Sequence, residues 1–211
     1  MNVAVVVPTY NQAAALPGAL RALKQQPLVT DVIVVDNGST DKTFAVAQQE
    51  QVKVAFEPRR GDGQACRAAL RVLPSGTEVV AFVRVGQIEA DRLAQLIEPL
   101  RSGAADLVIG AGGAQPMASR LACRLISMRF GRRVTTLGPL HAIRVDLLRR
   151  LSLHEEGSGW DVELQMKALK AGLRVIEVPI GGASASTPKA GTGAEAMRST
   201  WDTLGAVARN W

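Results

Sequence analysis

Residues 32–43 read Val-Ile-Val-Val-Asp-Asn-Gly-Ser-Thr-Asp-Lys-Thr, and this stretch decides the fold class of the chain. Its four β-branched apolar residues predict a strand buried on both faces, as the strands of a parallel sheet are. Asp36 stands where the strand ends, and the following Asn-Gly pair is typical of a turn. Ser39 or Thr40 then caps a helix that begins near Asp41. A carboxylate and a polar turn are therefore expected at the carboxyl edge of a central strand, where open α/β sheets bind ligands.

The first residues of the chain repeat this design. Val3–Val7 form a second continuous apolar run, which Pro8 interrupts and which Thr9, Tyr10 and Asn11 follow. Two such strands joined by one helix predict a crevice lined by polar side chains. Either stretch alone fits an ordinary polar loop of a doubly wound fold, but the two together favour a ligand site.

Both stretches also carry a resemblance to a known family. Val-Val-Val-Pro-Thr-Tyr-Asn at 5–11, followed by Val-Val-Asp-Asn-Gly-Ser-Thr-Asp at 34–41, resembles the family 2 glycosyltransferases with the GT-A fold. These motifs are most similar to those of the branch related to dolichyl- and polyprenyl-phosphate sugar synthases. The resemblance covers residues 2–180 and continues through four further stretches, at 57–63, 138–144, 159–164 and 171–179.

The resemblance implies a three-layer α/β/α fold with a mostly parallel, mixed central sheet. It implies binding of a UDP- or GDP-linked sugar and transfer of that sugar to an acceptor, expected to be a polyprenyl phosphate. It places Pro8, Thr9, Tyr10 and Asn11 around the base. The other implied nucleotide-sugar residues are Asp36 at the base or ribose, Asn37 beside it, and Arg59, Arg60 and Gly61 close to the diphosphate or base. Arg144 and Lys189 are implied at the acceptor.

The family's metal motif is missing from this sequence. In the family, the strand that corresponds to Val79–Val83 ends in an Asp-x-Asp motif that holds Mg²⁺ or Mn²⁺, but here Arg84-Val85-Gly86 follows it. Hard cations prefer carboxylate oxygens, so we predict no metal site. Two interpretations of Arg84 stay open: its guanidinium replaces the cation at the diphosphate, or it marks a motif that has decayed.

Other departures favour a second hypothesis, a pseudo-glycosyltransferase that acts as a binding or regulatory module. Thr136 and His141 stand where relatives carry an aspartate and an arginine, and the acceptor loop at 181–193 keeps only one cation, Lys189. Asp161 occupies the position of a catalytic base in many inverting relatives, but an acidic residue also suits any helix start. The two histidines, His141 and His154, are expected at the surface or in loops.

Composition gives broader limits. The chain has 211 residues, a net charge of +6 and a pI near 9.9, which indicate an anionic partner. Aromatic residues make up only 4%, which disfavours a nucleic-acid platform. Cys66 and Cys123 each fall in an apparent helix and are expected to be buried and reduced. The chain has neither a signal-peptide pattern nor an apolar run of about 18 residues, so we expect a cytoplasmic protein with peripheral contact at the inner membrane face.

The expected organisation is a glycosyltransferase-like domain at 1–180, a glycine-rich loop at 181–193 and a helix at 194–211. The stripe Met197, Trp201, Leu204 and Ala208 predicts that this helix closes the core or forms a homodimer interface. The apolar helix at 117–130 carries arginines, so it either packs on the core with a solvated basic face or touches a membrane.

Overall fold

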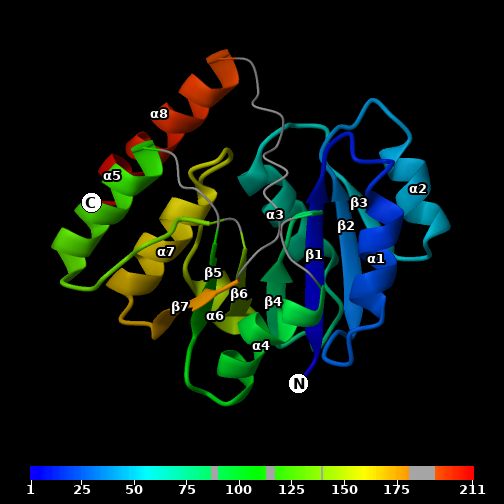
Figure 1. Ribbon diagram of the computed structural model, residues 1–211, viewed down its shortest axis with the longest axis horizontal. Helices are drawn as coiled ribbons and strands as arrows, with labels where there is room; N and C mark the ends of the chain where they lie inside the picture. The colour runs from blue at the N-terminus through cyan, green and yellow to red at the C-terminus, as the bar shows by residue number, and fades with distance from the viewer. Residues whose placement is uncertain (87–89, 113–116, 139, 181–192) are drawn as a thin grey trace.

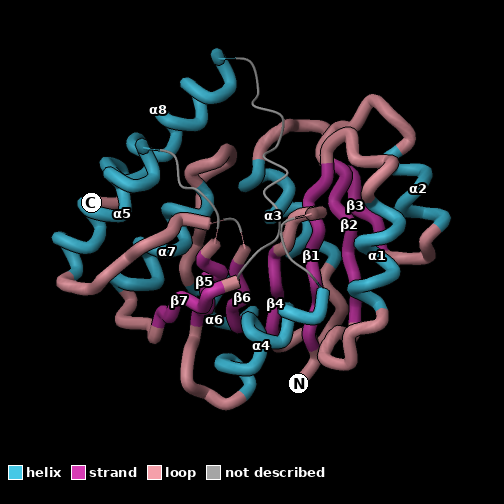
Figure 2. The backbone as a smooth tube through the Cα atoms, in the orientation of Figure 1, coloured by secondary structure: helices cyan, strands magenta, loops and turns pink. Residues whose placement is uncertain are grey.

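The computed structural model describes residues 1–86, 90–112, 117–138, 140–180 and 193–211, and it contains a seven-stranded sheet with helices on both faces (Figures 1 and 2). The strands are β1 (Val3–Thr9), β2 (Asp31–Asp36), β3 (Lys53–Phe56), β4 (Val79–Phe82), β5 (Leu107–Ala111), β6 (His141–Arg144) and β7 (Val175–Pro179). The helices are α1 (Leu16–Lys24), α2 (Thr43–Gln49), α3 (Asp62–Val72), η1 (Ala90–Arg92), α4 (Leu93–Arg101), α5 (Met117–Phe130), α6 (Val145–Arg150), α7 (Trp160–Lys170) and α8 (Gly193–Arg209).

The sheet has the strand order β3-β2-β1-β4-β6-β5-β7. The strands β3, β2, β1 and β4 run parallel to one another, whereas β6 is antiparallel to both of its neighbours. β5 and β7 again run parallel to each other. The predicted α/β fold with a mostly parallel, mixed sheet is therefore confirmed.

Alternating side chains of the central strands feed two separate cores, because successive residues of a strand point to opposite faces. Val3, Val5 and Val7 of β1 pack with α1 and α4 on one face, whereas Ala4 and Val6 pack with α3 and α7 on the other. These strand residues are at most 1% exposed, which explains why the sequence runs are continuously apolar.

A third apolar cluster lies beyond the β7 side of the sheet, where α5 and α8 pack on α7 (Figure 1). It contains Ala122, Cys123 and Ile126 of α5, Val162 and Met166 of α7, and Ala206 and Val207 of α8. For Trp201 and Ala208 the expectation of closing the core is therefore wrong, whereas the homodimer interface stays a prediction. Trp201 is 69% exposed and Ala208 is also exposed, because the small residues on the opposite side allow close helix packing.

Candidate functional site

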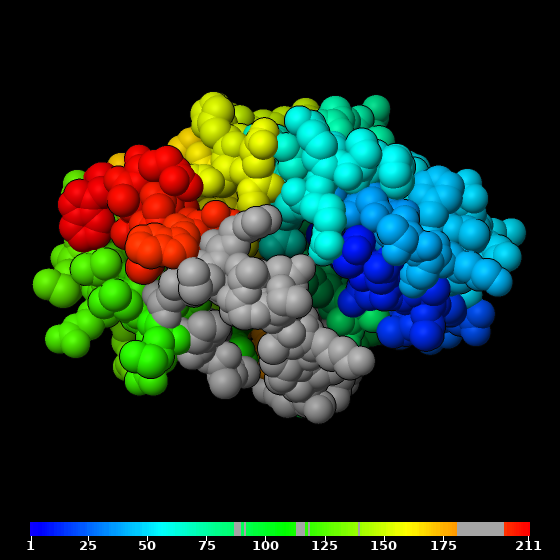
Figure 3. All heavy atoms as spheres, turned by 90° about the horizontal axis from the view of Figure 1, so that it is seen from above, coloured from blue at the N-terminus to red at the C-terminus, as the bar shows by residue number. Residues whose placement is uncertain are grey.

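The predicted ligand edge is formed by the ends of four neighbouring strands. β1 ends at Thr9, β2 ends at Asp36, and Arg84 follows β4. His141 begins the antiparallel strand β6 and pairs in register with Phe82, so it lies at the same edge. Figure 3 looks onto this edge and shows a hollow bordered by the N-terminal segment in blue, the segment after β3 in cyan and the segment before α7 in yellow.

The two turns after β1 and β2 hold each other in place. Asn11 adopts a positive φ of 51°, and its Oδ1 accepts a hydrogen bond from the N–H of Thr40 at 2.8 Å. The hydroxyl of Ser39 accepts one from the N–H of Asn11 at 3.0 Å. Asp36 is 1% exposed, and its Oδ1 accepts a hydrogen bond from the N–H of Ser39 at 3.0 Å. The contribution of Asp36 to stability is therefore larger than a strand-end turn residue suggests.

Tyr10 and Arg60 meet across the mouth of this turn pair. The guanidinium carbon of Arg60 lies 3.4 Å from the centre of the Tyr10 ring, within cation–π distance. Arg60 is exposed and Tyr10 is half-buried. The structure thus brings together two residues that the resemblance implies at the nucleotide.

Asn37 is engaged inside the protein. Its Nδ2 donates to the carbonyl oxygens of Glu57 at 3.2 Å and Arg59 at 2.7 Å, and its Oδ1 accepts from the N–H of Gly61 at 2.8 Å. These three bonds use both hydrogens of the amide and position the loop after β3. Asn37 therefore shapes the loop that carries the arginines.

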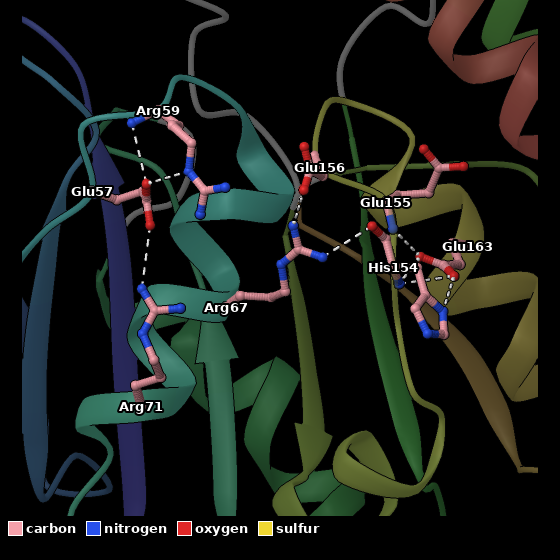
Figure 4. A network of polar contacts seen from close by, with 8 residues as sticks. All are labelled: Glu57, Arg59, Arg67, Arg71, His154, Glu155, Glu156 and Glu163. Atoms are coloured by element: carbon pink, nitrogen blue, oxygen red, sulfur yellow. Dashed lines mark hydrogen bonds and ion pairs between the residues drawn. The ribbon is translucent and has the colours of Figure 1, made fainter.

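Glu57 anchors the same loop from below (Figure 4). It is 3% exposed, and its Oε1 lies 3.2 Å from the Nε of Arg59 while its Oε2 lies 3.2 Å from a guanidinium nitrogen of Arg71. Burial opposes ionisation of Glu57, but the hydrogen bonds from Arg59 and Arg71 outweigh it and lower its pKa. The Arg59 guanidinium is therefore already paired with Glu57, while 66% of the Arg59 side chain stays exposed to solvent.

The glycines at the start of α3 serve a close backbone approach. Gly63 and Gln64 donate their N–H groups to the carbonyl oxygens of Gly157 and Glu156, at 3.3 and 3.1 Å. A Cβ on Gly61 or Gly63 would overlap the carbonyl oxygens of residues 156 and 155, respectively. These N–H groups are occupied: Gly61 donates to Oδ1 of Asn37, and Gly63 and Gln64 donate to the segment before α7, so they are not free to bind a diphosphate.

The segment before α7 is held by charged side chains from two helices (Figure 4). Arg67 of α3 donates to the carbonyl oxygen of His154 at 3.0 Å and pairs with Glu156 at 3.0 Å. Glu163 of α7 is 3% exposed and accepts the N–H groups of His154 and Glu155 at 2.8 and 2.7 Å. This bracing fixes the approach of α7, and with it the position of Asp161 in the first turn of α7.

Four polar side chains and one thiol meet at the end of β4. Asp62 and Arg84 form an ion pair of 2.7 Å, with 34% and 30% of their side chains exposed. Asp161 lies 3.6 Å from Nδ1 of His141, and Cys66 lines the same small cavity. His141 is 1% exposed and stacks on Phe82 with 4.9 Å between ring centres. The expectation of a surface His141 is therefore wrong, because pairing with β4 buries it.

The electrostatics of this cluster favour an uncharged Asp161. Burial raises the pKa of Asp161 to about 8; the Arg84 guanidinium lowers it, and the Asp62 carboxylate raises it again. Burial also raises the pKa of the Cys66 thiol well above its usual range. Burial opposes the charge on Arg84, but Asp62 and Asp161 raise its pKa, so Arg84 stays cationic. At neutral pH the cluster holds one guanidinium, one carboxylate and one protonated carboxyl group.

This donor set does not fit a divalent metal. A hard cation needs converging carboxylate oxygens, but the carboxylate of Asp62 already binds a guanidinium at the end of β4. Within the ranges that the structure describes, no three His, Cys, Asp or Glu side chains converge in a way that could hold a metal ion. The cation in the described part of the cluster is the Arg84 guanidinium, which is ion-paired with Asp62.

Of the two predicted acceptor residues, only Arg144 lies within the described residues, and it is not found at this edge. Arg144 ends β6 and pairs in register with Val79, so it lies at the opposite edge of the sheet from His141. Its Nε lies 3.6 Å from Asp146, and the assignment of Arg144 to an acceptor site in this crevice is wrong. Lys189 lies outside the described residues. The sequence did not lead us to expect Asp62 or His141 in the site. For Asp62, its position at the start of α3, directly after the loop that follows β3, was a signal that could have indicated it.

Comparison with known proteins agrees with this architecture. Residues 4–134 match the model of the family described as glycosyl transferase family 2. An uncharacterised glycosyltransferase of Mycobacterium tuberculosis is 35% identical over 188 residues, which span 84% of both chains. The undecaprenyl-phosphate mannosyltransferase of Micrococcus luteus is 30% identical over 203 residues, 85% of this chain and 83% of that protein.

A solved structure gives the same result for the fold. The glucosyl-3-phosphoglycerate synthase of Mycobacterium tuberculosis, in complex with Mn²⁺, UDP and glucosyl-3-phosphoglycerate, superimposes with a TM-score of 0.84. The superposition covers 99% of this chain and 79% of that one, at 21% sequence identity. The fold is therefore that of the GT-A glycosyltransferases. The chain belongs to glycosyltransferase family 2.

Proposed function

We propose that this chain binds a UDP- or GDP-linked sugar at the carboxyl edge of β1, β2 and β4 and transfers the sugar to a polyprenyl-phosphate acceptor. The observation that carries the proposal is the position of Arg84 at the end of β4, beside Asp62 and Asp161. The similarity to an undecaprenyl-phosphate mannosyltransferase supports the acceptor class. The similarity to a structure that contains UDP supports the donor class.

In this proposal the base and ribose lie against the paired turns after β1 and β2. Pro8, Thr9 and Asn11 form one wall, and Asp36 accepts a donor from the base or ribose with the oxygen that does not bond Ser39. Tyr10 and Arg60 close over the nucleotide. Arg59 and Arg60 are exposed at the rim and face the diphosphate.

Arg84 stabilises the leaving group. As the bond between the anomeric carbon and the diphosphate oxygen breaks, the electron pair stays on that oxygen and its negative charge grows. A guanidinium placed beforehand stabilises this charge more strongly in the transition state than in the ground state. The acceptor phosphate oxygen is already anionic, and it forms the new bond to the anomeric carbon without losing a proton. Protonated Asp161 fits this scheme because no strong base is needed.

The second candidate is a nucleotide-sugar-binding protein without turnover. One observation favours it: Asp62 pairs with Arg84 at 2.7 Å and neutralises much of the charge that the leaving group needs. Such a protein would still bind the nucleotide through the β1 and β2 turns. It would act as a binding or regulatory module.

Two measurements test the proposal and separate the candidates. Calorimetry with UDP-glucose and GDP-mannose, with and without EDTA, should give saturable binding of at least one donor that EDTA does not change. Incubation of that donor, labelled in the sugar, with undecaprenyl phosphate should then give a labelled lipid product. Binding without product favours the second candidate, and absence of binding refutes both.

A further inference from the structure

The outer faces of α5 and α8 carry large apolar side chains that are exposed. On α5, Met117, Leu121 and Met128 are 85%, 50% and 73% exposed. Trp201 of α8 and Trp211 just beyond it are 69% and 51% exposed. Five of the eight large apolar side chains found exposed in the described chain thus lie on α5, on α8 or just beyond α8, and these two helices pack side by side (Figure 1).

The spacing on α5 makes the exposed residues one continuous stripe. Met117, Leu121, Arg124 and Met128 are separated by four, three and four positions, so they share one face of the helix. The buried residues Ala122, Cys123 and Ile126 lie on the opposite face, against α7. The helix is therefore apolar toward the core and again toward solvent.

On α8, Trp201 likewise lies opposite the face that packs on α7, which is formed by Thr203, Ala206 and Val207. α5 and α8 pack against each other, and the exposed face of each helix lies opposite the residues that it places in the third apolar cluster. Met117, Leu121, Met128, Trp201 and Trp211 are called the outer patch below.

The charge on α5 and on the turn that follows it has one sign. Residues 117–133 contain five arginines and no acidic residue: Arg120, Arg124, Arg129, Arg132 and Arg133. All five are exposed, and none forms an ion pair with a carboxylate in the described part of the chain. Arginines flanking apolar and tryptophan side chains are the composition of a surface that enters the headgroup region of an anionic bilayer.

We propose that the outer patch docks the protein on an anionic lipid surface. A second copy of this chain is a poorer occupant, because a two-fold contact would set arginine-rich α5 against itself without a carboxylate. β5 runs parallel to β1, so its carboxyl end lies at the crevice edge, and α5 begins six residues after it. Docking would therefore bring the crevice edge toward the lipid. The inference goes beyond the proposed function, because docking of the outer patch on an anionic bilayer does not require that the bilayer contain a polyprenyl-phosphate acceptor.

The test uses the full chain and vesicles that contain no polyprenyl phosphate. Co-sedimentation should show binding to vesicles of phosphatidylglycerol and phosphatidylcholine, weaker binding in high salt, and little binding to pure phosphatidylcholine. Replacing Arg120, Arg124 and Arg129 by glutamine should weaken binding about a hundredfold, since each arginine near an anionic surface contributes roughly fivefold. The Leu121→Ser/Met128→Ser variant should also lose binding. Phe56→Ser removes an exposed apolar side chain from the far strand β3, so it should bind as the parent does.

Tryptophan emission reports the contact directly. Trp160 is 1% exposed, whereas Trp201 and Trp211 are exposed, so brominated lipid should quench only the latter two. The Trp201→Phe/Trp211→Phe variant should still sediment with vesicles but lose the quenching. If the parent ignores anionic vesicles, the proposal is overturned. It is also overturned if sedimentation equilibrium shows a dimer that Leu121→Ser/Met128→Ser dissociates while vesicles have no effect. Nucleotide binding is unaffected in either case, so failure here leaves the proposed function untouched.

Discussion

Replacing Arg84 by glutamine tests the chemistry at the end of β4. Glutamine keeps hydrogen-bonding capacity and much of the volume but removes the charge that pairs with Asp62 at 2.7 Å. A hydrogen bond to a charged group contributes about 1.5–3 kcal/mol, so a UDP- or GDP-sugar should bind Arg84→Gln roughly ten- to hundredfold more weakly. The lower part of this range is expected, because Asp62 already shares the guanidinium.

The structure supplies both a control and an opposite variant. Arg144→Gln removes an equal charge at the other edge of the sheet, where Arg144 lies 3.6 Å from Asp146, so nucleotide affinity should not change. Asp62→Asn frees Arg84 from its carboxylate, so it should tighten binding of the diphosphate. The Asp62→Arg/Arg84→Asp variant keeps an ion pair but moves the cation from the β4 end to α3. It should bind the donor no better than Arg84→Gln does.

Calorimetry in excess EDTA measures all of these affinities. Thermal unfolding checks that each variant folds; a half-exposed ion pair contributes about 1 kcal/mol or less, so only small shifts are expected. The reasoning is refuted if Arg84→Gln binds the donor as the parent does. It is also refuted if EDTA abolishes binding by the parent, since a fixed guanidinium needs no metal.

Three further predictions concern single residues. Asp161→Asn should match the parent in stability only below about pH 4. Because the pKa of Asp161 is raised from 3.8 to about 8, the parent loses stability progressively as the pH rises from 3.8 through 8, so the variant should gain on it over that window and stay more stable above it. Thermal unfolding against pH measures this difference. Gly63→Ala should destabilise the fold by about 3 kcal/mol in urea unfolding, because the new Cβ would overlap a backbone carbonyl oxygen. Gly18→Ala is the control: a Cβ there meets open space, so this substitution should be neutral or stabilising. Asp36→Asn keeps an oxygen that accepts the N–H of Ser39, so the free energy of unfolding should change by no more than about 1 kcal/mol. Calorimetry should show nucleotide binding weakened by about 1–3 kcal/mol, and unchanged affinity would exclude Asp36 from the site.

The strands and the position of the crevice could be predicted because their signals are local. Each continuous apolar run predicts one strand from its own residues, and the strand expected at 31–35 is observed as β2 (Asp31–Asp36). The Asn-Gly turn after Asp36 needs only its neighbours to be recognised. The strand ends then follow from the rule that parallel strands share a carboxyl edge.

The charged cluster could not be predicted, because its members come from distant elements. Asp62 begins α3, Arg84 follows β4 and Asp161 begins α7, so no window of sequence contains the set. His141 reads as a loop residue until β6 pairs with β4 and sets it beside Phe82. The buried face of α8 could not be predicted for a similar reason: periodicity indicated the stripe of large side chains, whereas packing on α5 and α7 buries Thr203, Ala206 and Val207.

The charges of the site explain why the raised pKa of Asp161 matters for a diphosphate ligand. With Asp161 protonated, the charges of Asp62 and Arg84 cancel at the end of β4, which forms the floor of the site. The exposed Arg59 and Arg60 make the rim of the site positive. A ligand with two negative charges then meets an attractive rim and a neutral floor. Ionised Asp161 would instead give the floor a net charge of −1 beside the phosphates, a like-charge contact that costs binding energy. In the proposed function, burial of Asp161 therefore keeps this carboxyl group uncharged and limits the negative charge beside the position proposed for the diphosphate.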